Sequence, residues 1–136
     1  MMTAESQPGS SRLIGHGIDL VEVPDFARLL VPPASQFIDR HFTHTELAAA
    51  GEGVERTQRL AARFAVKEAV MKALGVGWGA GIAFTDVEVV ATARGAPGVI
   101  LHRELAELAR SRGISSWMVS VSHGRNTTIA SVLAVS

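Results

Sequence analysis

Residues 55–74, ERTQRLAARFAVKEAVMKAL, decide the architecture around which the rest of the chain is arranged. The stretch is rich in alanine and contains no glycine or proline. It is followed by Gly75, and glycine is the residue type that most often ends a helix. We therefore expect one long helix here. Small and apolar residues surround Phe64, which predicts that the middle of this helix is largely buried.

Strands and shorter helices are expected on both sides of this helix. Apolar, β-branched stretches predict strands over residues 13–23, 84–92, 99–101, 117–122 and 127–135. Shorter helices are expected over residues 24–31, 35–42, 43–50 and 102–112, the third opening with a Thr43–Glu46 capping box. Separate groups of strands and helices, without regular alternation, indicate an α+β fold.

The length and composition limit the class of protein. A chain of 136 residues is expected to form a single domain over residues 12–136, behind a flexible, polar segment over residues 1–11 that is no signal peptide. The 13 basic and 13 acidic residues leave no net charge, which argues against a nucleic-acid partner. The absence of cysteine excludes disulfides, thiolate zinc sites and a cysteine nucleophile. With no apolar run of roughly 18 residues, we expect a cytoplasmic protein without a membrane partner.

Asp19 lies in the apolar stretch 13–23, LIGHGIDLVEV. Alternate side chains of a strand share a face, so Asp19 lies on the same face as Gly15 and Gly17. Two glycines beside a carboxylate are expected to leave space for a ligand or a metal. An ionised carboxylate among apolar neighbours also needs a cationic partner. The alternative is an acid at a strand end that is bonded to a loop or paired with an arginine.

Charged residues also occur in the middle of the long helix. Phe64, Glu68 and Lys72 follow one another at intervals of four and lie along one face, and Arg63 and Lys67 form the neighbouring row. Charges at the centre of a half-buried helix indicate a site that acts on a charged ligand. The alternative is a solvated Glu68–Lys72 pair, which would stabilise the helix by about 0.3 kcal/mol.

Two further segments are candidates for ligand binding. Residues 75–81, GVGWGAG, are neither a Walker A motif nor a dinucleotide fingerprint, but their backbone N–H groups can face an anion; a mobile loop is the alternative. Residues 117–124, WMVSVSHG, place Ser120 and Ser122 on one strand face and His123 at the following turn. No G-x-S-x-G elbow indicates a hydrolase, and a lone histidine there can equally be structural.

Three segments occur in an order that is typical of one family. They are GIDLVEV at 17–23, RFAVKEAVMKALGVG at 63–77 and VSVSH at 119–123. Together they resemble the motifs of the small phosphopantetheinyl transferases, the holo-acyl-carrier-protein synthases. The resemblance extends over almost everything from Leu13 to Val135. It implies the single-domain fold of that family, with an antiparallel sheet packed against a long central helix.

The resemblance also implies a reaction. These enzymes move the 4′-phosphopantetheine arm of coenzyme A onto a serine of an apo acyl carrier protein, require Mg2+, and release adenosine 3′,5′-bisphosphate. By resemblance, Asp19 and Glu68 are the metal ligands, and Glu68, Lys72 and His123 are the catalytic residues. Glu68, or a water near it, is the first choice for the general base and His123 the second. Mn2+ could use the same oxygen ligands as Mg2+.

The resemblance implies coenzyme A contacts in the second and third motifs and in a late turn. These residues are Lys67, Lys72, Gly75, Gly77, Gly95, Pro97, Ser120, Ser122 and His123. The small class of the family is typically a homotrimer with active sites at the subunit interfaces. That arrangement would place Asp19 and His123 of one subunit near Glu68 and Lys72 of another.

The chain departs from the family pattern at three positions. Asp25 stands where many relatives carry an arginine that docks the acidic carrier protein, so Arg28 and Arg40 are the nearest substitutes. Ala96 stands in a turn where relatives often have lysine or arginine, and Gly124 follows the histidine where some have a polar residue. The departures support a second hypothesis, a catalytically silent module that binds coenzyme A or a carrier. The retained carboxylates and lysine argue for the enzyme, as part of fatty acid or polyketide biosynthesis.

Overall fold

The long helix forms as expected and runs through the centre of the computed structural model, which describes residues 10–33 and 35–136. This helix, α4 (Arg56–Leu74), ends at Gly75, which adopts a left-handed conformation with φ of 68°. Glycine has no Cβ and takes this conformation without strain, so the local sequence is sufficient to end the helix there.

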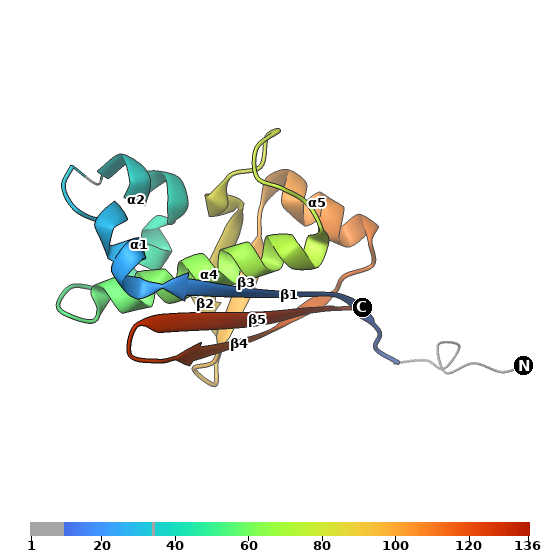
Figure 1. The fold of residues 1–136 in the computed structure, drawn as a ribbon. Coiled ribbons are helices and arrows are strands. Elements are labelled where there is room, and N and C mark those ends of the chain that lie inside the picture. The colour runs from blue at the N-terminus through green and yellow to red at the C-terminus, as the bar shows by residue number, and fades with distance from the viewer. Residues whose placement is uncertain (1–9, 34) are drawn as a thin grey trace, which may run out of the picture.

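Two antiparallel sheets surround α4. The larger has the strand order β1-β5-β4, and the smaller pairs β2 with β3. Their bounds are β1 (Leu13–Glu22), β2 (Val87–Ala91), β3 (Pro97–Leu101), β4 (Ser116–His123) and β5 (Thr127–Val135). Figure 1 shows α4 lying along β1 and β5. The expectation of an α+β fold with antiparallel strands against a central helix is confirmed, with the strands divided between two sheets.

The face of β1 that carries Asp19 packs directly on α4. A Cβ atom on Gly17 would lie 1.8 Å from the carbonyl oxygen of Ala69, and one on Gly15 would lie 2.3 Å from that of Ala73. The expectation that these two glycines leave space for a ligand is therefore wrong. They let the helix backbone approach the strand, because any larger residue would separate the two elements.

The shorter helices gather at the two ends of α4. Figure 1 shows α1 and α2 at one end and α5 at the other. The bounds are α1 (Val23–Leu29), α2 (Ser35–His41), α3 (His44–Ala50) and α5 (Arg103–Ser111). The predicted capping box is confirmed: the Glu46 backbone N–H donates to Thr43, and the Thr43 backbone N–H donates to the Glu46 carboxylate at 2.8 Å.

The strand expected over residues 84–92 begins later than predicted. Residues Phe84–Asp86 form a short 3-10 helix, η2, and β2 follows from Val87. The Asp86 carboxylate explains the turn, because it accepts a hydrogen bond from the Ala83 backbone N–H at 2.9 Å and binds Arg103 at 2.7 Å. This turn determines where the Phe84 ring lies.

Residues 1–9 lie outside the described residues, so the flexible segment over 1–11 and the domain boundary that follows it stay predictions. Among the helices in the described part of the chain, none is long and apolar enough to cross a membrane.

Candidate active site

Asp19 and Glu68 line one cavity of about 360 Å³, which we call the carboxylate cavity. Asp19 comes from β1 and Glu68 from the middle of α4, while α1 forms another wall with Phe26 and Leu29. Phe64, one turn before Glu68, also faces it. Phe64 and Glu68 of the helical row and Asp19 of the strand face, which the sequence indicated separately, therefore line the same cavity.

Lys72 is the cationic partner that Asp19 was expected to need. Its Nζ lies 3.0 Å from Oδ1 of Asp19 and donates to the carbonyl oxygen of Ile18 at 3.1 Å. The alternatives of an arginine partner for Asp19 and a solvated Glu68–Lys72 pair are thereby wrong. The trimer arrangement inferred above is also wrong in one respect, because Asp19, Glu68 and Lys72 come together within a single chain.

The environment of Glu68 disfavours its charged form. Partial burial raises the pKa of the Glu68 carboxyl, and the negative charge of Asp19 raises it further. A hydrogen bond from the indole of Trp78, at 3.3 Å to Oε2, and the charge of Lys72 both oppose this rise. Trp78 was not predicted as a site residue. The signal that could have found it is a large aromatic residue within a glycine-rich loop.

The donor set of the carboxylate cavity fits a hard divalent cation. Mg2+ prefers oxygen ligands and commonly uses one or two carboxylates, with substrate phosphates and water completing its coordination. Asp19 and Glu68 supply two carboxylates. No cluster of three or more acidic, histidine or cysteine ligands exists within residues 10–33 and 35–136. A cation held here therefore needs a further ligand from substrate or solvent.

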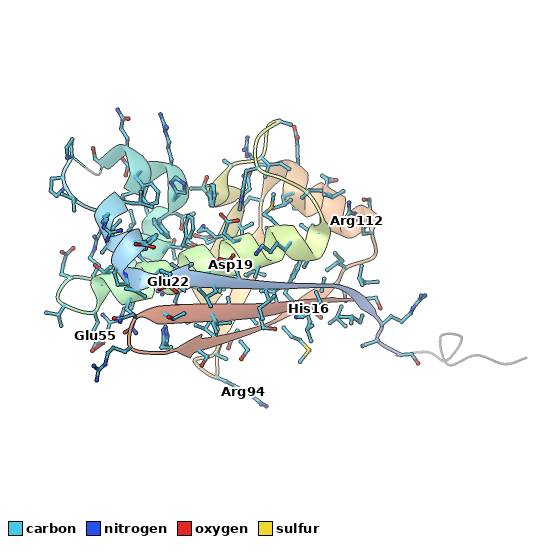
Figure 2. All side chains as sticks on the ribbon, in the orientation of Figure 1. His16, Asp19, Glu22, Glu55, Arg94 and Arg112 are labelled. Carbon is cyan, nitrogen blue, oxygen red and sulfur yellow. The ribbon has the colours of Figure 1, made fainter. Side chains whose placement is uncertain are left out.

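A second cavity, of about 480 Å³, brings together three residues that lie far apart in the sequence. Gly95 and Pro97 come from the turn between β2 and β3, and His123 from the end of β4. Arg59 and Arg63 of α4 complete it, and we call it the arginine cavity. Figure 2 shows Asp19 where β1 passes α4, and Glu55, which lines the arginine cavity, at the N-terminal end of α4.

Neither arginine of this cavity was predicted as a site residue, although Arg63 was noted in the charged row beside Glu68. Burial lowers the pKa of the Arg63 guanidinium, the negative charge of Glu46 opposes this, and the positive charge of Arg59 lowers the pKa further. Nε of Arg63 is buried and has no hydrogen-bond partner within the described residues. Arg59 is bound to Glu55 at 2.9 Å. A buried donor without a partner, beside a like charge, favours an anion in this cavity.

Ser120 and Ser122 do not lie on the same face of β4 as His123. Strand alternation turns Val121 and His123 toward the arginine cavity, while both serines are exposed on the opposite face of β4. His123 is held by Thr128, whose Oγ1 lies 3.2 Å from Nδ1 of the ring. The expectation that both serines line the site of His123 is therefore wrong within one subunit.

Lys67 is the clearest correction among the predicted ligand contacts. Its side chain is fully buried and its Nζ lies 2.9 Å from Oε1 of Glu46, whose side chain is equally buried. The ammonium also donates to the carbonyl oxygens of Phe84, at 3.0 Å, and Val87. All three of its donors are engaged, so Lys67 is not a coenzyme A contact but a buried structural residue.

The remaining predicted residues lie at the surface. Gly75 and Gly77 begin the loop after α4 and line neither of the two cavities. Arg28 lies 2.5 Å from Asp25 in an exposed pair on α1, and Arg40 is exposed on α2. The cation expected to dock a carrier is therefore partly neutralised by Asp25.

Comparison with known proteins decides the family. The model of the 4'-phosphopantetheinyl transferase superfamily matches residues 15–130. The chain belongs to this superfamily. The match includes both carboxylates, Lys72 and His123, so every catalytic residue inferred from the sequence lies within it.

Within this superfamily, the chain is similar to holo-[acyl-carrier-protein] synthases. A holo-[acyl-carrier-protein] synthase of Koribacter versatilis is 36% identical over 89% of this chain and 97% of its own length. The crystal structure of the synthase of Neisseria meningitidis superimposes with a TM-score of 0.81 at 30% identity, covering 90% of this chain and 98% of that one. The synthase of Helicobacter pylori, solved in complex with coenzyme A, gives a TM-score of 0.75 at 28% identity, covering 89% and 99%.

Proposed function

We propose that this protein transfers the 4′-phosphopantetheine arm of coenzyme A to a serine of an apo acyl carrier protein. The observation that carries the proposal is the shared cavity of Asp19 and Glu68, with Lys72 bound to Asp19, in a chain of this superfamily. Holo-[acyl-carrier-protein] synthases are similar to it over most of their length, and one was solved with coenzyme A.

In this proposal Asp19 and Glu68 hold Mg2+. When bound there, the cation offsets negative charge on the diphosphate of coenzyme A. Lys72 is bound to Asp19, which lines the cavity, and its side chain is more than half exposed, so it can reach a phosphate oxygen. Phosphoryl transfer depends mainly on positioning and charge neutralisation, and these three side chains supply both.

The transfer requires a proton acceptor for the serine. The serine Oγ forms a bond to the β-phosphorus of coenzyme A while the bond from that phosphorus to the bridging oxygen breaks, and adenosine 3′,5′-bisphosphate leaves. We assign the serine proton to Glu68 or to a water near it, because Glu68 lies in the carboxylate cavity and only its Oε2 is engaged by a described donor. His123 is less suitable within one chain, since it lines the arginine cavity.

We assign the arginine cavity to the 3′-phosphate of the coenzyme A nucleotide. Arg63 offers a buried Nε without a hydrogen-bond partner among the described residues, and His123 lines the same cavity. We expect Arg63→Ala to raise the KM for coenzyme A roughly 10-fold to 100-fold, because a hydrogen bond to a charged group contributes about 1.5–3 kcal/mol. Steady-state kinetics with coenzyme A and with 3′-dephospho-coenzyme A measure this effect.

The dephosphorylated substrate is the critical comparison for Arg63. The parent and Arg63→Ala should have the same KM for 3′-dephospho-coenzyme A, since the phosphate that Arg63 binds is absent. Arg110→Ala, on the exposed face of α5, serves as the matched control and should change neither constant. Equal losses with both substrates would contradict the assignment to the 3′-phosphate.

We also propose that three copies of the chain assemble through the outer face of the large sheet. Cross-strand rows on this face are Leu20–Ile129–Ser122, Ile18–Ser131–Ser120 and His16–Leu133–Met118. The rows contain no acidic residue, lysine or arginine, and the side chains of Ile18, Leu20 and Met118 are more than half exposed. Glu22 is the acidic residue at the end of this face, and the three rows without such a charge, with their exposed aliphatic residues, fit a second copy of the same chain.

Assembly would also explain why the carboxylate and arginine cavities are separate in one chain. The adjacent residues Arg63 and Phe64 face different cavities. We propose that the arginine cavity of one subunit adjoins the carboxylate cavity of its neighbour, so that one coenzyme A spans both. Light scattering tests this: the parent should have about three times the 14.4 kDa chain mass, and Ile18→Asp should lower it. A monomeric parent would exclude the shared site.

Carrier docking depends on the charge of α1. We expect Asp25→Arg to lower the apparent KM for an acidic carrier by up to about fivefold, which corresponds to the value of an exposed ion pair. The substitution adds a cation and releases Arg28 from its pair with Asp25. Glu107→Arg is the matched control, because Glu107 forms a similar exposed pair with Arg110 on α5. An unchanged KM in Asp25→Arg would show that docking here is not electrostatic.

Intact-mass spectrometry tests the overall proposal. An apo acyl carrier protein incubated with this protein, coenzyme A and Mg2+ should gain one phosphopantetheine group. The gain should be lost with a chelator and with Asp19→Ala. If no carrier in a panel gains mass while coenzyme A still binds, the catalytically silent module is the better description.

A further inference from the structure

The loop that follows α4 carries a tryptophan whose indole contacts Glu68 in the carboxylate cavity. Trp78 is half-buried between glycines at positions 77 and 79, and its Nε1 donates to Oε2 of Glu68 at 3.3 Å. A backbone bridge between Gly79 and Ile82 closes the loop immediately behind it. Gly79 has a φ of 100°, which a residue with a side chain rarely adopts, so the turn that presents the indole depends on glycine.

Aromatic stacking determines the orientation of this indole. The Trp78 ring lies 3.7 Å from the Phe84 ring, with an angle of 15° between the planes. Phe84 stacks in turn on Phe64 at 5.5 Å and 9°. Phe64 lies on α4 one turn before Glu68, so the column of three rings returns to the helix that carries the carboxylate.

The backbone of the middle ring is held from the protein interior. The carbonyl oxygen of Phe84 accepts a hydrogen bond from the buried ammonium of Lys67, which is itself paired with Glu46. Lys67 immediately precedes Glu68 on α4. The same helix thus carries the carboxylate, the residue that anchors η2, and the first ring of the column. This leaves the Trp78 N–H little freedom relative to Glu68.

Four acidic residues line the cavity, Asp19, Glu22, Asp25 and Glu68. Asp19 and Glu68 each have one oxygen held by a donor from α4 or from the loop that follows it. Lys72 holds Oδ1 of Asp19, and Trp78 holds Oε2 of Glu68. The other two oxygens, Oδ2 of Asp19 and Oε1 of Glu68, accept no hydrogen bond from any described residue. A carboxylate with one oxygen fixed and the other free is oriented for a ligand in the cavity, as outer donors orient metal ligands in general.

We propose that Trp78 is a positioning residue for Glu68, whose indole N–H fixes the carboxylate in the orientation needed to hold a divalent cation. The inference rests on the proposed function, since it concerns the same carboxylate pair. Trp78 does not contact the reacting atoms. Its contribution is the hydrogen bond, and the Phe84 stack makes that bond specific in direction.

Trp78→Phe tests the hydrogen bond, because phenylalanine can keep the stacking but has no N–H. We expect the affinity for Mn2+, measured by electron paramagnetic resonance without substrate, to fall about 10-fold, as for the loss of other outer donors. The kcat should fall by a similar factor while the KM for coenzyme A stays within about twofold. Trp117→Phe removes the other tryptophan of the chain, on β4, and should change none of these values.

Fluorescence provides a readout that does not depend on turnover. In the Trp117→Phe background Trp78 is the sole tryptophan, and Mg2+ should change its emission. Adding Glu68→Gln should remove that change. Equal Mn2+ affinity and equal kcat in Trp78→Phe and the parent would overturn the positioning role while transfer persists. A parent that binds no Mn2+ would overturn the role together with the metal site, so the two failures are distinguishable.

Discussion

Glu68→Gln should lower the rate of phosphopantetheine transfer by at least about 100-fold, the smaller end of the contribution expected from a general base. The substitution removes the negative charge that holds the cation and the proton acceptor that we assign to the serine. It keeps the size of the side chain and an oxygen that can accept the Trp78 hydrogen bond. Intact-mass analysis of the carrier over time measures the loss.

Folding of this variant should be unchanged. Glu68 is only half-buried, and burial already disfavours its charge, so a neutral amide is well tolerated. Circular dichroism and the midpoint of urea unfolding should match the parent. Glu52→Gln, at an exposed position before α4, is the control for the chemical change itself. A fully active Glu68→Gln enzyme would remove Glu68 from both of its proposed roles.

Lys67→Met should lower the free energy of unfolding by about 3–5 kcal/mol, because it leaves the carboxylate of Glu46 buried without its cation. Both side chains are fully buried, and the substitution also removes the donor to Phe84 and Val87. Domains of this size have about 5–15 kcal/mol of stability, so the loss should be visible as a lower midpoint in urea.

Two variants separate the charge effect from loss of packing. Lys72→Met, on the same helix, breaks an ion pair whose lysine is more than half exposed, and it should cost less than about 1 kcal/mol. Adding Glu46→Gln to Lys67→Met should recover part of the stability, because glutamine can keep the capping box without a buried charge. If Lys67→Met unfolded at the parent's urea concentration, the buried pair would not stabilise the fold.

The Lys67 result would also bear on the active site. Lys67 anchors η2, whose Phe84 ring supports Trp78, and Trp78 donates to Glu68. The stability of the interior and the orientation of the Glu68 carboxylate therefore share one set of contacts. Lys67 belongs to the family motif, but its contacts in this structure stabilise the fold around the site.

Local patterns in the sequence were sufficient for the main elements and for the family. The helix period, the capping box at Thr43 and the glycine after Leu74 act over a few residues, so each could be assigned without the fold. Asp19 and Glu68 were each noticed on a predicted face, but only the family resemblance associated them, and it placed them on different subunits, whereas both line one cavity of a single chain. Comparison with known transferases confirmed the family that the three motifs had indicated.

The sequence by itself was sufficient for most of the secondary structure and for the family, and it singled out Asp19, Glu68 and Lys72 as candidate site residues. The tertiary structure alone decided their surroundings: Gly17 admits a helix and not a ligand, Lys67 is buried against Glu46, and Trp78 reaches Glu68. Arg63 and His123, which are far apart in the sequence, also line one cavity. Burial and hydrogen-bond partners come from segments far apart in the chain, and no local pattern of residues specifies which of those segments will meet.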